Sequence, residues 1–257
     1  MKIVLTFDIE RDIPNVLNTY FGVKVGLLKI LKLLDNFNIN ATFFCTGNVA
    51  EHLPENIRLI ERKGHEIACH GLKHERLNQL GLKKCQEALS QSKKIIENIC
   101  QNSEIIGFRS PYLNPPQYLF KVLNNLGFKY DSSIKSHKKL QFYQNCNNGI
   151  QEFPPSNYNI LFRIPIKNSL LLKWIFKKKL MILYFHPKEV LNMKDVIRNQ
   201  MSAINKFLNL SYRPDRWFYT GDIFNTKINN FIRDSLLKEA EFLTLKQLYL
   251  QERDIKI

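Results

Sequence analysis

The chain has 257 residues, of which 44% are hydrophobic and 24% are charged, and these values are ordinary for a globular protein. The length suits one α/β barrel, and the sequence has no apolar run of about 18 residues that would predict a membrane-spanning helix. Lys and Arg (38) outnumber Asp and Glu (23), and the resulting charge of +15 favours anionic partners such as an acidic bilayer, a phosphorylated substrate or nucleic acid.

The first two thirds of the chain alternate between strand and helix patterns. Buried strands are predicted at 3–7, 41–45, 66–69, 105–108 and 128–130. Helices are predicted between them at 25–37, 51–62, 82–99 and 116–126. Repeated strand–helix units favour a parallel α/β fold, and a barrel fits their number better than an open sheet.

The last third of the chain is less regular. Residues 132–160 are polar and predict a long loop. A sharp strand pattern follows at 180–185, then a helix pattern at 188–208 and a helix–strand pair at 232–245. No repeat or linker divides the chain, so we expect one domain over 1–257, with its core in about 1–190 and a C-terminal helix and strand extension.

The five cysteines form no CxxC pair and are odd in number. The first predicted strand begins at Ile3, which leaves no room for a signal peptide before it. We therefore expect reduced thiols and a cytoplasmic location.

Asp8 and Glu10 directly follow the first predicted strand and are separated by one residue. If the strand continues, both carboxylates face the same side of the sheet. Two acids after a strand often cap a helix or lie in a solvated turn. An acid that follows a wholly apolar strand, however, has few such structural roles. We expect one carboxylate to bind a metal and the other to act as a general base.

His70 and His74 are four residues apart, a spacing that places two imidazoles on one face of a helical turn. The zinc-protease pattern has Glu directly after the first histidine, whereas this chain has Gly71. A lone HxxxH pair is weak evidence for a metal. Two histidines and one carboxylate, however, would leave open the coordination positions that a catalytic metal requires.

Arg109 and His186 each follow an apolar strand, where such residues often have only structural roles. A guanidinium near Asp8 would keep that carboxylate ionised, and His186 could serve as a general acid. Pro111 restricts the backbone beside Tyr112, whose N–H could then face a developing oxyanion. Catalytic groups of parallel barrels lie at the carboxyl ends of strands, and four candidates fall at such ends: Asp8, His70, Arg109 and His186.

Together these residues resemble the polysaccharide deacetylase family (NodB-homology domain), which includes chitooligosaccharide and peptidoglycan N-acetylglucosamine deacetylases. The resemblance extends to connecting segments at 41–44, 64–68 and 242–245. It implies a distorted (β/α) barrel with about seven parallel strands, and a hydrolase of N-acyl groups. It also implies residue roles: Asp8 as base, Arg109 to orient it, His186 as acid, Tyr112 as backbone donor to the oxyanion, and Glu10, His70 and His74 as metal ligands.

The same resemblance implies a divalent metal ion. Zinc suits the mixed nitrogen and oxygen ligands best, with cobalt, nickel, iron and manganese as alternatives. The substrate would be an N-acetylated amino sugar, and the predicted location favours an intracellular glycan or lipid-linked precursor.

One family signature is missing. Relatives carry an Asp-x-x-x-Trp segment that lines the substrate groove and tunes the acid histidine, and this chain has no matching segment. Asp131 falls near that place without the tryptophan. We expect Asp131 and Pro111 to contact the substrate, and the partner of His186 is left unassigned.

A segment at 169–179 combines a leucine run, Trp174 and four lysines, a composition typical of a surface that lies on an anionic bilayer. It predicts peripheral contact with the inner membrane surface, and a helix packed on the barrel is the structural alternative.

Two other functions stay open. The spaced acids and the missing tryptophan also fit hydrolysis of a cyclic imide or ureide, as in allantoinase-like relatives. The net charge could instead indicate a non-catalytic protein that binds nucleic acid. Against the latter, the basic residues are dispersed and no aromatic-interleaved RNA motif appears.

Overall fold

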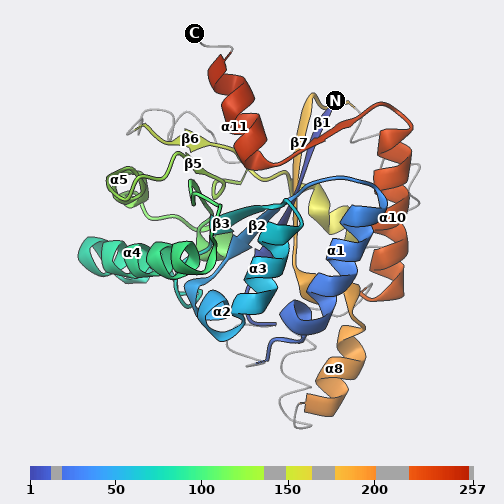
Figure 1. The fold of residues 1–257 in the computed structure, drawn as a ribbon, viewed down its shortest axis with the longest axis horizontal. Helices are drawn as coiled ribbons and strands as arrows, with labels where there is room; N and C mark the ends of the chain where they lie inside the picture. The colour runs from blue at the N-terminus through green and yellow to red at the C-terminus, as the bar shows by residue number, and fades with distance from the viewer. Residues whose placement is uncertain (13–18, 136–148, 164–176, 201–219, 255–257) are drawn as a thin grey trace.

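The computed structural model describes residues 1–12, 19–135, 149–163, 177–200 and 220–254 (Figure 1). Within these segments eight strands form one sheet: β1 (Lys2–Ile9), β2 (Thr42–Cys45), β3 (Glu66–Cys69), β4 (Gly107–Phe108), β5 (Tyr130–Asp131), β6 (Gln151–Glu152), β7 (Leu180–Phe185) and β8 (Glu241–Leu243). All of their pairings are parallel.

The strands follow the order β6-β5-β4-β3-β2-β1-β7. Short β8 pairs with the first residues of β1, and β2 pairs with β1 from Thr6 onward. The two ends of the sheet meet at Ser156, which follows β6. Its N–H donates to the Ile182 carbonyl of β7 at 2.7 Å, and its Oγ accepts from the Ile182 N–H at 3.2 Å. These contacts curl the sheet into the expected distorted (β/α) barrel.

Helices cover the outside of the strands (Figure 1). The α-helices are α1 (Leu27–Asn36), α2 (Gly47–His52), α3 (Pro54–Arg62), α4 (Leu82–Ile99), α5 (Leu119–Asn125), α8 (Met193–Gln200), α10 (Asp222–Leu236) and α11 (Leu245–Asp254). Segments of 3-10 or π helix are η1 (Gly22–Gly26), η2 (Leu77–Gln79), η3 (Pro111–Leu113), η4 (Asn157–Arg163) and η5 (Pro187–Val190).

Strand β1 divides the core into two layers. Ile3, Leu5 and Phe7 belong to the large cluster between the sheet and the helices, whereas Val4 belongs to a smaller cluster inside the barrel. Because side chains alternate along a strand, the residues that share the face of Val4 point inward. Asp8 is one of them, so the pattern that buries β1 on both faces also places this carboxylate inside the barrel.

The structure corrects several predicted boundaries. The helix expected at 51–62 is two helices, because the chain turns at Leu53 and Pro54 starts α3, where a proline needs no N–H donor. The loop expected at 132–160 contains β6 and the start of η4. The helix expected at 188–208 is interrupted after η5, and helix α11 follows the predicted C-terminal strand.

The predicted bilayer-facing segment is largely outside the described residues, which include only its lysines from 177 onward. Membrane contact therefore stays a prediction. None of the helices in the described part of the chain combines the length and apolarity needed to cross a bilayer.

Candidate active site

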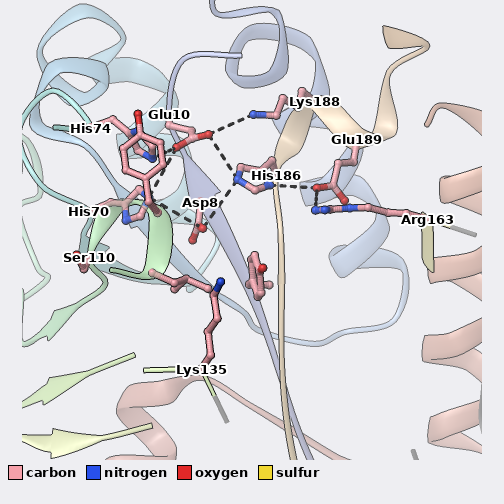
Figure 2. Close-up of a pocket in the computed structure, with 13 residues that line it drawn as sticks. Asp8, Glu10, His70, His74, Ser110, Lys135, Arg163, His186, Lys188 and Glu189 are labelled. Atoms are coloured by element: carbon pink, nitrogen blue, oxygen red, sulfur yellow. Dashed lines mark hydrogen bonds and ion pairs between the residues drawn. The ribbon is translucent and has the colours of Figure 1, made fainter. Parts of the chain in front are cut away.

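Asp8 and Glu10 lie at the carboxyl end of β1, where both line one pocket, together with His70 and His74 (Figure 2). Both carboxylates are buried, with exposed fractions of 4% and 6%. A buried carboxylate is costly unless cations or hydrogen bonds compensate its charge. The partners of these two acids therefore indicate what the pocket is built to do.

The two histidines are brought together by a loop rather than by the helical turn that their spacing suggested. His70 follows β3 directly, and the chain then turns through Gly71 and His74, whose φ angles are +80° and +61°. The Nδ1–H of His70 donates to the Arg109 carbonyl at 2.8 Å. This bond leaves the Nε2 lone pair of His70 directed into the pocket, the arrangement typical of a metal-binding imidazole.

One ligand atom from each of Glu10, His70 and His74 lies within 4.8 Å of the other two. Oε2 of Glu10 is 2.5 Å from Nε2 of His74 and 3.7 Å from Nε2 of His70. That buried oxygen faces both imidazoles and has no other hydrogen-bond partner among the described residues. A cation at this point would compensate it, and two imidazoles with one carboxylate are suitable ligands for a catalytic divalent ion.

The electrostatics of the cluster favour positive charge. Burial lowers the pKa of His70, but Asp8 and Glu10 outweigh burial and raise it above the ordinary value. Burial raises the pKa of Glu10, but Lys188 and His74 hold it well below the usual range. A site that stabilises a proton on its imidazole through nearby carboxylates also stabilises a metal cation there.

Arg109 is fully buried and joins three strands of the barrel. Its Nη1 donates to Oδ1 of Asp8 and to Oγ1 of Thr6, both at 2.8 Å, and its Nε and Nη2 donate to Ser132. The guanidinium also lies over the ring of Phe44, 4.1 Å from its centroid. Burial raises the pKa of Asp8, but Arg109, His70 and His186 outweigh it, so this carboxyl stays ionised.

His186 follows β7, and its Nε2 faces the two acids, 3.4 Å from Oε1 of Glu10 and 4.0 Å from Oδ2 of Asp8. Its Nδ1 is 3.0 Å from Oε1 of Glu189, and the same oxygen accepts from Arg163 (Figure 2). The partner of His186 is thus a glutamate three residues later, supported by an arginine from η4. Burial and Lys188 lower the pKa of His186, although Glu189 raises it.

Tyr112 lines the pocket within η3 and has a φ of +62°, unusual for a residue other than glycine. Its ring packs on that of His74, with centroids 4.5 Å apart, and the Arg76 guanidinium lies over the Tyr112 ring, 4.2 Å from its centroid. Strained backbone at non-glycine residues concentrates at functional sites. The expected role of the Tyr112 N–H stays a prediction.

Two expected substrate contacts do not line the pocket. Asp131 is fully buried, and its Oδ1 accepts from Ser133 Oγ at 2.6 Å. Ser133 Oγ in turn accepts from the Ser110 N–H at 2.7 Å. Asp131 therefore supports the loop that carries Pro111, which is also buried outside the pocket lining.

Four charged pocket residues were missed from the sequence: Lys135, Arg163, Lys188 and Glu189. Lys188 and Glu189 follow His186 within three residues, so a His-x-x-Glu spacing could have suggested a carboxylate partner. Lys135 lies four residues after β5, and Arg163 is the last residue of η4. Their sequence surroundings contain no comparable signal.

The model of the polysaccharide deacetylase family matches residues 1–130, just over half of this 257-residue chain. The chain is 28% identical over 123 residues to the peptidoglycan deacetylase of Helicobacter pylori. That match covers 48% of this chain and 42% of the relative, so the chain spans less than half of the relative's length.

Solved structures share the whole fold at low sequence identity. A Mycobacterium smegmatis protein assigned as a polysaccharide deacetylase superposes with a TM-score of 0.72 and 20% identity, covering 100% of this chain and 91% of the other. An allantoinase superposes with a TM-score of 0.68 and 13% identity, covering 96% and 88%. These identities establish the fold alone. With the match over residues 1–130 and the barrel that holds those residues, the chain belongs to the polysaccharide deacetylase family.

Proposed function

We propose that this protein is a metal-dependent hydrolase that removes an N-acetyl or other N-acyl group from an amino sugar. The observation that carries the proposal is the convergence of Glu10, His70 and His74 beside Asp8 in one buried pocket. Family membership supports deacetylation as the reaction class. The ligand set fits zinc best, and cobalt, nickel, iron or manganese would also suit it.

A divalent ion held by Glu10, His70 and His74 would polarise the amide carbonyl and activate water. Asp8 then takes a proton from the attacking water as its oxygen bonds to the carbonyl carbon. Arg109 keeps Asp8 ionised and aimed for this step. In this proposal the Tyr112 N–H donates to the oxyanion.

His186 completes the reaction in this proposal. The C–N bond breaks as His186 donates a proton to the departing nitrogen, because an amide anion is too basic to leave unprotonated. Glu189 accepts from the other ring nitrogen and holds the ring toward the pocket. The products are a carboxylate, acetate in the simplest case, and a free amino sugar.

The test uses the zinc-loaded protein and a panel of N-acetylated sugars and glycan precursors, both free and lipid-linked. Mass spectrometry measures the release of the acyl group. Asp8→Asn should lower turnover by about 10²–10⁴-fold, the usual contribution of a general base, while metal content is unchanged. His70→Ala should lose both metal and turnover. His52→Ala, at an exposed histidine outside the pocket, is the matched control.

Turnover that survives both Asp8→Asn and His70→Ala would contradict the proposed roles. The alternative function is hydrolysis of a cyclic imide or ureide, and the fold that the chain shares with an allantoinase motivates it. A second panel of cyclic imides and ureides distinguishes this function from deacetylation. Release from that panel alone would favour the alternative. The intracellular precursor and the cytoplasmic location stay predictions.

A further inference from the structure

Glu10, one of the three proposed metal ligands, presents its two carboxylate oxygens to opposite sides of the pocket. Oε2 faces the imidazoles, 2.5 Å from Nε2 of His74 and 3.7 Å from Nε2 of His70. Oε1 faces the other way and lies 3.1 Å from Nζ of Lys188 and 3.4 Å from Nε2 of His186 (Figure 2). One oxygen of this carboxylate thus belongs to the ligand cluster, and the other is held outside it.

The hydrogen bond from Lys188 separates the two oxygens. Its Nζ donates to Oε1 of Glu10 at 3.1 Å, and both side chains are largely buried, with exposed fractions of 11% and 5%. Among the described residues, Glu10 is the only carboxylate within ion-pair distance of this ammonium group. The last torsion of a glutamate side chain is broad and roughly twofold, so it does not itself select which oxygen meets an ion. A buried, charge-assisted hydrogen bond to Oε1 makes that selection.

The backbone of Lys188 is fixed by a close approach of two helical segments. Segment η1 packs against η5, which carries Lys188. A Cβ atom added to Gly22 would lie 2.8 Å from the Lys188 nitrogen, and one added to Gly26 would lie 2.1 Å from the Pro187 carbonyl oxygen. Only glycine permits this approach, because neither position has room for a side chain. The lysine is therefore anchored at both ends, through its backbone and through Nζ.

We propose that Lys188 is a positioning residue of the metal site: by holding Oε1 of Glu10, it makes Oε2 the single oxygen through which Glu10 binds the divalent ion. The inference rests on the proposed metal-dependent function and deepens it. Two imidazoles and one oxygen supply three protein ligands, which leaves positions on the ion for water and for the amide carbonyl. A second Glu10 oxygen on the ion would occupy one of these positions.

The test is the visible absorption spectrum of the cobalt-substituted protein, which reports the number of ligands on the ion. Tetrahedral Co²⁺ absorbs more strongly than five- or six-coordinate Co²⁺. In Lys188→Met, Oε1 of Glu10 is released and can also bind the ion, so we expect weaker absorption per bound ion than in the native protein. Cobalt content is measured for each protein at saturating metal, so that the spectra are compared per ion.

Lys135→Met is the matched control for this spectrum. Lys135 also lines the pocket, but it is not among the described contacts of Glu10, so its loss should leave the cobalt spectrum unchanged. Turnover of Lys188→Met should fall by about 10–100-fold, as is usual when the hydrogen-bond partner of a metal ligand is lost.

A crystal structure of the zinc-loaded native protein gives a second measurement that does not depend on the folding of a variant. We expect one Glu10 oxygen about 2.0–2.2 Å from zinc and the other on Lys188. Both oxygens on the ion would overturn the inference. An unchanged cobalt spectrum in Lys188→Met, or an equal change in Lys135→Met, would overturn it too.

Each of these contrary results leaves the proposed deacylase function standing. Failure of that function shows differently, because the native protein would then bind no divalent ion or would release no acyl group from any substrate of the panel.

Discussion

Glu189 illustrates what single residues contribute to this pocket. Its Oε1 lies 3.0 Å from His186 Nδ1 and also accepts from Arg163. Burial raises the pKa of Glu189, but Arg163 and His186 outweigh it and lower the pKa. An ionised Glu189 fixes the orientation of the His186 ring and favours its protonated form. Glu189 is thus the hydrogen-bond partner of His186 that the sequence left unassigned.

Glu189→Gln should shift the activity profile to lower pH. Glu189 raises the pKa of His186, so removing its charge lowers that pKa further. A general acid must be protonated, and the fall of kcat/KM at high pH should therefore begin at lower pH. Lys188→Met should shift it the opposite way, because Lys188 lowers the same pKa. Shifts of equal sign in the pH–rate profiles of the two variants would contradict His186 as the acid.

At the scale of elements, the site is built from residues that lie at the carboxyl ends of strands. Arg109 follows β4 and hydrogen-bonds residues of β1 and the segment after β5. The apolar strand pattern that precedes Arg109 in the sequence predicted that Arg109 lies at a strand end. The sequence could not show that the guanidinium would be wholly buried, because burial depends on the curvature of the sheet, which brings β1 close to Arg109 although two strands separate β1 from β4.

Arg109→Met should lower the free energy of unfolding by about 3–5 kcal/mol, since it leaves the buried Asp8 carboxylate without its cation. Asp8→Asn removes that uncompensated charge. In the double variant we therefore expect a smaller loss than the sum of the two single losses. Urea denaturation of the four proteins measures the coupling, and strictly additive losses would argue against a direct charge pair.

The turn between α3 and β3 carries His65, which is buried against Phe43 with ring centroids 5.3 Å apart. Burial lowers the pKa of His65 from 6.5 to about 4. Between these values the unfolded chain binds a proton that the folded chain does not, so stability falls as the pH falls. The pH dependence of the unfolding free energy that this group causes approaches about 1.4 kcal/mol per pH unit.

His65→Gln should flatten the loss of stability between pH 6.5 and about 4, the interval set by the lowered pKa of His65. Denaturant unfolding at several pH values gives the slope for each protein. His52→Gln, at an exposed histidine, serves as the control and should keep the native slope. A native slope in His65→Gln would show that other groups produce the effect.

At the scale of the whole molecule, the proposed metal site links the strand ends of the barrel. Its ligands come from β1 and from the loop after β3, so an ion bound there connects segments 60 or more positions apart in the sequence. A ligand that binds only the folded state stabilises that state by mass action. Metal binding should therefore be visible in thermal unfolding as well as in activity.

Zinc at about 100 times its dissociation constant should stabilise the protein by about 2.7 kcal/mol, which raises Tm by roughly 5–10 °C for a chain of this size. A chelator should reverse the shift. His70→Ala should abolish it, whereas His52→Ala should retain it. An unchanged Tm in native protein across a series of divalent ions would count against the proposed site.

The sequence by itself determined the strand–helix order, the family resemblance and the identity of the clustered residues. These depend on local features: the apolar run of β1, its alternation, and short motifs at strand ends. It did not determine the loop geometry of His70 and His74 or the burial of Asp131. Nor did it identify Glu189, Lys188 and Lys135 as neighbours of the site. Those depend on tertiary structure, because the pairing of β7 with β1 brings the segment after β7 to the pocket, and the curl of the sheet brings the segment after β5 there.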